Sequence, residues 1–93
     1  MIKSFRDKET ERIFNRSFSR RLPPDIQRTA LRRLLYLHAV KELRDLATPP
    51  SLRLEALSGD RQGQYSIQIN ERWRICFEWI DGDASHVEIV DYH

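Results

Sequence analysis

The sequence predicts an α+β domain in which an antiparallel sheet carries helices on one face. Two observations support this class. Up to residue 47 the apolar residues recur at helical spacing, whereas from residue 52 onward they alternate with polar residues, as they do in strands. Turn residues separate the alternating segments, which favours hairpin connections. The 93 residues, of which 40% are hydrophobic, suffice for one domain that spans residues 1–93.

Two helices are expected in the first half, after a short start, "MIKSF", that could pair as a strand. The segment "KETERIFNR" at 8–16 has apolar residues at helical spacing. A second helix should run from about Pro24 to about Ala39, because proline has no amide hydrogen to lose at a helix start and Asp25 favours the helix dipole. A further helical turn or two in "KELRDLATPP" should end at Thr48, since a residue before proline avoids the helical region. The apolar stripe of the second helix comprises Ile26, Ala30, Leu34 and Leu37.

Strands are expected at "LRLEAL" (52–57), "QYSIQIN" (64–70) and "RWRICFEWI" (72–80), with turns at 62–63, 70–72 and 81–83. A last strand follows, in which Val87 and Ile89 alternate with polar residues and which carries Asp91, Tyr92 and His93. Successive side chains of a strand point to opposite faces of the sheet. The strand from Trp73 therefore has an apolar face, which Trp73, Ile75, Phe77 and Trp79 form, and an alternate face with Arg72, Arg74, Cys76 and Glu78.

Several function classes are excluded by composition. No apolar run is long enough for a signal peptide or a membrane span, and Cys76 has no partner cysteine, so we expect a cytoplasmic protein with no membrane association. The three histidines and the cysteine lack the short paired spacing of a zinc site, and there is no phosphate-binding glycine loop. We therefore expect no metal and no cofactor.

Charge is unevenly distributed along the chain. Residues 1–47 contain 12 Lys and Arg against 6 Asp and Glu, whereas residues 48–93 contain 4 against 8. This segregation indicates a surface that meets phosphate or an acidic partner on one side, although ordinary solvated helix faces explain it equally well. The basic residues predicted to dock RNA lie on the second helix: Arg28, Arg32 and Arg33.

Two residues stand out as candidates for chemistry. Arg74 should be fixed near the middle of a strand, a geometry suited to clamping a phosphate, although on spacing alone a half-exposed sheet arginine is the commoner explanation. His93 has a side chain that titrates near neutrality, although most such histidines are inert surface residues. Arginine, histidine and tyrosine without a metal are the residues of a ribonuclease that uses the RNA 2′-hydroxyl as nucleophile.

Three segments, "MIKSF", "RLEALSGDRQGQYSIQINERWRICFEW" and "VEIVDYH", resemble the HigB toxins, or killer proteins, of the RelE/ParE superfamily. The resemblance covers essentially the whole chain. It implies a compact RelE-like fold and a bacterial type II toxin that cleaves mRNA, usually in the ribosomal A site. It also implies a HigA-like helix-turn-helix antitoxin that holds the toxin inactive, with operator DNA bound only through the antitoxin complex.

The resemblance also implies site residues. His93 matches the catalytic histidine and would protonate the leaving 5′-oxygen, Arg74 matches the strand arginine, and Tyr92 and Asp91 match the flanking positions. Several family members have a lysine where this chain has Ser58, so Arg61 is our candidate for the missing cation. The alternative is a toxin that does not cleave and instead binds RNA, a ribosome-assembly partner or gyrase.

Overall fold

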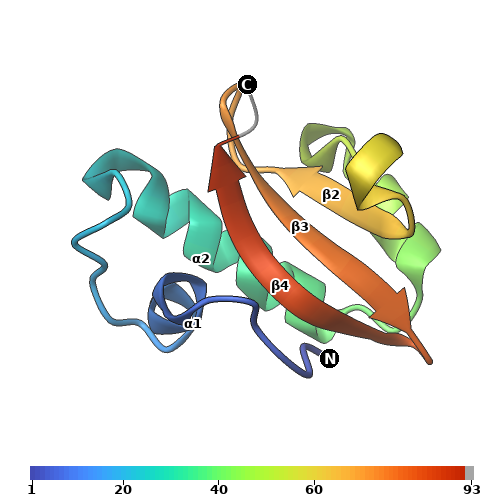
Figure 1. Ribbon diagram of the computed structural model, residues 1–93, viewed down its shortest axis with the longest axis horizontal. Helices are drawn as coiled ribbons and strands as arrows, with labels where there is room; N and C mark the ends of the chain where they lie inside the picture. Colours follow the sequence, from blue (N-terminus) through green and yellow to red (C-terminus); the bar gives the residue numbers. More distant parts are fainter. Residues whose placement is uncertain (92–93) are drawn as a thin grey trace.

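The computed structural model describes residues 1–91 and confirms the α+β class (Figure 1). Four strands form one sheet in the order β1-β2-β3-β4, and each strand is antiparallel to its neighbours. The elements are α1 (Lys8–Phe14), α2 (Pro24–Ala39), the 3-10 helices η1 (Leu43–Ala47) and η2 (Pro50–Leu52), β1 (Glu55–Ala56), the 3-10 helix η3 (Gly59–Arg61), β2 (Gln64–Gln68), β3 (Trp73–Ile80) and β4 (Asp83–Asp91).

The two α-helices pack on one face of the sheet. In Figure 1, α2 crosses behind β3 and β4, and α1 contacts both α2 and β4. The predicted bounds of α2 are confirmed, and its apolar stripe is buried as expected. The core between the helices and the sheet is centred on Ile67, Ile75 and Ile89, which pair across three neighbouring strands and therefore share one face.

The predicted strand at 52–57 is largely wrong. Only Glu55–Ala56 is strand, while Pro50–Leu52 forms a 3-10 turn. The two prolines, Pro49 and Pro50, have fixed φ angles and no amide hydrogens for a ladder, so they favour a turn. Arg53 then adopts a left-handed conformation with φ 45°, which redirects the chain and puts Leu52 in the core.

The outer edge of β4 is covered by the amino-terminal segment, as the strand-like start of the sequence predicted. Ile2 pairs in parallel with Ala84, and Phe5 pairs with Val87. His38 of α2 accepts a hydrogen bond at Nδ1 from the amide of Ile2, at 3.1 Å, which holds the segment in place. Pairing of this kind protects an edge strand from association with other chains. Within residues 1–91 no helix is long and apolar enough to cross a membrane.

We predict that Thr10→Val destabilises the fold. Thr10 is fully buried in α1, and its Oγ1 accepts a hydrogen bond from the amide of Ile89 in β4 at 2.9 Å. Valine keeps the shape but leaves that amide unpaired, which costs about 1–3 kcal/mol of unfolding free energy. Thermal melting should show a midpoint about 5–15 °C lower. The exposed Thr48→Val is the control, and equal midpoints for the two variants would contradict the role of this bond.

Candidate functional site

The face of the sheet opposite the helices carries the polar side chains of the three long strands. Residues that pair directly in an antiparallel sheet share a face. Two such rows cross this sheet on the side away from the core, and we call them together the polar face. The rows are Gln68, Arg74 and Val90, and Ser66, Cys76 and Glu88.

Arg74 is the central cation of the polar face, and only 6% of the residue is exposed. Its Nε donates to Ser66 Oγ at 2.7 Å, and one terminal nitrogen donates to the carbonyl oxygen of Arg53 at 2.6 Å. The same nitrogen lies 3.1 Å from Glu55 Oε1. A buried guanidinium requires such partners, because it has lost its hydration.

The predicted position of Arg74, opposite the apolar face of β3, is therefore confirmed, but its expected half-exposure is wrong. The cause is the segment around Arg53 and Glu55, which forms two of these contacts with the guanidinium. Alanine at this position would remove the donor from the buried Ser66 hydroxyl and from the carbonyl oxygen of Arg53. We therefore expect Arg74→Ala to lower stability as well as activity.

Arg61 extends from η3 toward β4, where it meets a second arginine. Its Nη1 lies 3.1 Å from Glu88 Oε2 and 3.0 Å from Gln64 Oε1. Arg6 reaches the same Glu88 oxygen through Nε, also at 3.1 Å. The Glu88 side chain is only 16% exposed, so two cations hold a half-buried carboxylate. These four residues and Asp60 line a cavity of about 460 Å³.

The position of Arg6 at this site was not predicted from the sequence. Arg6 lies on the amino-terminal segment, and only the parallel pairing of that segment with β4 brings it to Glu88, which is 82 residues away in sequence. No spacing pattern in the sequence carries that information.

Ser58 precedes η3 and is exposed at the surface. Its carbonyl oxygen accepts a hydrogen bond from the amide of Arg61, at 3.2 Å, so the two residues belong to one turn. Gly59, with φ 63°, and Gly63, with φ 93°, frame this turn in conformations that glycine adopts without strain. Arg61 is the cation nearest in the chain to the position of the absent lysine, and its proposed role as substitute stays a prediction.

The structure does not bring Asp91 to Arg74. Asp91 pairs with Trp73 and so lies on the side of the core face, where it accepts two hydrogen bonds from Arg72 Nε at 2.9 and 3.0 Å and one from Arg72 Nη2 at 2.7 Å. These contacts raise the pKa of Arg72 above its usual value. The predicted residues Tyr92 and His93 lie outside the described residues.

The three helix arginines differ from one another. Arg28 and Arg32 are exposed on α2, whereas Arg33 donates through Nε to the carbonyl oxygen of Gln68 at 3.2 Å and so holds α2 to the end of β2. Because α2 covers the core face, these arginines lie on the other side of the sheet from Arg74. The two predicted sets of basic residues are thus separate surfaces.

The polar face offers no reactive thiol. Cys76 is completely buried, and this burial raises the pKa of its thiol above the ordinary value, against a smaller opposing effect of Arg61. The thiol is therefore neutral near pH 7 and is a poor nucleophile. Among residues 1–91 there is also no group of three or more His, Cys, Asp and Glu side chains that could hold a metal ion.

Two helices on one face of a small antiparallel sheet, with arginines held on the other face, fit a class of small protein toxins. Over residues 3–93 the sequence matches the family described as the RelE-like toxin of type II toxin-antitoxin system HigB. The chain therefore belongs to the HigB-like toxins, and the resemblance inferred from its motifs is confirmed. Because toxins of type II systems act with an antitoxin, this chain has an antitoxin as partner.

Two curated relatives agree with this assignment. Toxin HigB-1 of Vibrio cholerae serotype O1 is 36% identical over 85 residues, which cover 90% of each chain. Endoribonuclease HigB of Proteus vulgaris is 33% identical over 93 residues, which cover the whole of both chains.

We predict that Cys76 makes the fold less stable in alkali. Because the pKa of the folded thiol is raised, the unfolded chain loses its proton first, and stability falls as pH rises above about 8.5, the value for a free thiol. Below that pH the neutral Cys76 thiol contributes its full share of the stability of the fold. Urea unfolding between about pH 7 and pH 10 should therefore show a steeper decline for the natural chain than for Cys76→Ala. Equal slopes would contradict the prediction.

Proposed function

We propose that this toxin is a metal-independent endoribonuclease that cleaves mRNA by using the RNA 2′-hydroxyl as nucleophile. The relative from Proteus vulgaris, which aligns over its full length, is named an endoribonuclease. The observation that carries the proposal is the position of Arg74. Its guanidinium is fixed on the polar face. The preceding residue of β3, Trp73, pairs with Asp91 of β4, and Tyr92 and His93 follow Asp91 directly in the sequence.

The proposed roles follow from what the reaction needs. The 2′-oxygen attacks the phosphorus, and the bond from phosphorus to the 5′-oxygen breaks, so the leaving oxygen needs a proton donor, which is His93. The pentavalent phosphate gains negative charge, which Arg74 and Arg61 stabilise. Because Arg74 is already held by Ser66, Arg53 and Glu55, it has little freedom to lose when substrate binds. Tyr92 stacks on a base, and Ser58 contacts the RNA beside the reacting phosphate. Asp91, which the sequence also predicted as an RNA contact, is bound to Arg72 on the other side of the sheet and has no role in this scheme.

We further propose that the mRNA is cleaved on the ribosome in the cytoplasm, with Arg28 and Arg32 contacting RNA phosphates from the helix side. Their exposure on α2 supports this role, whereas Arg33 is engaged by the fold. The antitoxin is proposed to be a HigA-like helix-turn-helix protein, through which the pair binds operator DNA.

Mapping of new RNA 5′ ends tests the function. The purified chain is incubated with mRNA on translating ribosomes, and with free mRNA in the presence of EDTA. New ends that depend on the toxin are expected on the ribosome, and cleavage of free RNA, where it occurs, should survive EDTA. Growth arrest without any new RNA end would contradict the proposal and favour a toxin that inhibits by binding RNA, a ribosome-assembly partner or gyrase.

We predict that His93→Gln lowers the cleavage rate by about 10²- to 10⁴-fold, because glutamine cannot donate a proton to the leaving oxygen at neutral pH. Single-turnover cleavage of the same RNA is the measurement. His86→Gln is the matched control, since His86 is an exposed histidine of β4 that pairs with Glu78 at 2.9 Å. Full activity of His93→Gln would contradict the proposal that His93 is the general acid.

We predict that Arg74→Lys lowers the cleavage rate by about 10- to 100-fold. Lysine keeps the charge and most of the buried stem, so the fold is disturbed less than by alanine, but it loses the planar fork that can hold Ser66, Arg53 and a phosphate together. Arg72→Lys is the control, and circular dichroism checks that both variants are folded. A folded Arg74→Lys variant with unchanged cleavage would contradict a role for the fork.

A further inference from the structure

The loop between α1 and α2 presents an exposed aromatic ring among arginines. Phe18 is 62% exposed, more than any other large apolar residue among the described residues. Residues 12–21 contain four arginines and no acid. An apolar ring held in water beside so many cations is typical of a surface that another molecule covers.

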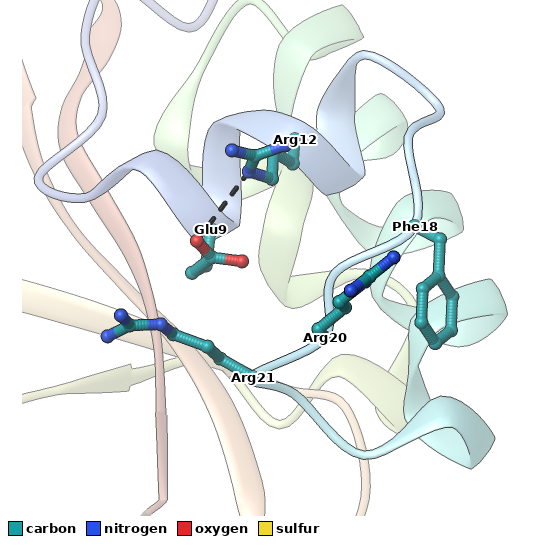
Figure 2. Close-up of a pocket in the computed structure, with 5 residues that line it drawn as sticks. All are labelled: Glu9, Arg12, Phe18, Arg20 and Arg21. Atoms are coloured by element: carbon teal, nitrogen blue, oxygen red, sulfur yellow. Dashed lines mark ion pairs between the residues drawn. The ribbon is translucent and has the colours of Figure 1, made fainter.

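Phe18 separates two hollows in the surface. One is a pocket of about 360 Å³ that Figure 2 shows, with the Arg20 side chain beside the ring, Arg12 projecting from α1 and Arg21 pointing away from the ring. The other is a groove of about 520 Å³ between the helices, with Ile13 and Leu31 as its apolar residues. We call the two hollows and the ring the Phe18 surface. Its basic residues are Arg12, Arg16, Arg20, Arg21 and Arg28.

A buried polar network fixes the loop that carries this surface. Ser19, directly after Phe18, is fully buried, and its hydroxyl donates to Glu9 Oε1 at 2.6 Å while it accepts from the amides of Arg21 and Leu22. The Gln27 side chain accepts from the Ser19 amide at 3.1 Å and donates to its carbonyl oxygen at 2.8 Å. The loop is therefore ordered before a partner arrives, which lowers the entropy cost of binding.

Arg16 has a left-handed backbone conformation that glycine usually adopts at the end of a helix. Two hydrogen bonds end α1. The Arg16 amide donates to the carbonyl oxygen of Ile13 at 3.0 Å, and the Ser17 amide donates to the carbonyl oxygen of Arg12 at 2.8 Å. In this type of helix end the residue in the place of Arg16, here with φ 63°, is usually glycine. The turn itself therefore does not explain the arginine, which lies at the rim of the groove.

We propose that the Phe18 surface binds an acidic, amphipathic segment of the antitoxin. An apolar side chain of that segment fills the groove against Ile13 and Leu31, and its carboxylates pair with Arg16 and Arg20. The apolar groove favours a peptide over a nucleic acid backbone, which would use the arginines alone. A second copy of the chain bound through the same surface would bring like charges together.

The inference depends on membership in a type II toxin family and not on ribonuclease activity. The loop lies at one side of the molecule, and η3 with Arg61 lies at the other (Figure 1). The antitoxin contact is therefore separate from the proposed contact of Arg61 and Arg74 with RNA, so the two can fail independently in an experiment. Arg28 lines the groove and is also a proposed RNA contact, so the tested variants are confined to Phe18, Arg16 and Arg20.

The test measures the affinity of the full chain for its own full-length antitoxin by calorimetry at low and high salt. Phe18→Ala should bind at least about 10-fold more weakly, because a central aromatic anchor is lost. The pair Arg16→Glu and Arg20→Glu should also bind at least about 10-fold more weakly, with reversed or flattened salt dependence. Arg16→Gly should melt at the same temperature or higher and still bind more weakly, which separates binding from stability.

Two control variants change exposed residues elsewhere. Ile80→Ala removes an exposed apolar side chain of β3, and Arg44→Glu reverses an exposed cation of η1. Both should bind the antitoxin like the natural chain, and cleavage of RNA by Phe18→Ala should stay within about two-fold of normal. Unchanged antitoxin affinity in the Phe18 and Arg16 variants would overturn the inference. So would a loss of RNA binding in the same variants without a loss of antitoxin binding.

Discussion

The buried charge of Arg74 is the constraint on which the site depends. A guanidinium taken out of water must be satisfied by the protein, and its partners come from β2, from the turn after η2 and from β1. These contacts attach the segment around Arg53 and Glu55 to the sheet, although β1 itself is only two residues long. η3 begins three residues after β1, so these contacts also help to place the turn that carries Arg61. Loss of a buried partner is expensive, whereas loss of an exposed ion pair costs little.

This constraint also shapes the chemistry that the polar face can perform. A cation that is fixed before substrate arrives stabilises developing charge without reorganisation. Glu88 holds Arg61 and Arg6 in a similar way. The neighbouring thiol of Cys76 is kept neutral by burial, so charge on this face resides in arginines and carboxylates. The face is thus suited to binding a phosphate and unsuited to attack by a protein nucleophile.

Much of the fold could be predicted because its signals are local. The proline start and apolar stripe of α2 and the alternation in β3 depend on neighbouring residues, and both predictions are confirmed. The 3-10 turn at Pro50–Leu52, the burial of Arg74 and the pairing of Arg6 with Glu88 depend on contacts between distant segments. A single sequence has no periodic pattern for such contacts. The predicted roles of Tyr92 and His93 rest on the chemistry of their side chains and on motif resemblance, because both lie outside the described residues.

The Phe18 surface and the polar face with Arg74 lie on different sides of the sheet, which bears on how an antitoxin could inhibit the toxin. An antitoxin bound at the Phe18 surface contacts the helix side of the sheet, so it does not need to touch Arg74 to silence the toxin. The fold also connects the two surfaces through α1, because Glu9 binds the Phe18 loop and the adjacent Thr10 binds Ile89, the neighbour of Glu88. Any partner that displaced α1 would therefore disturb β4 and, through Glu88, the position of Arg61.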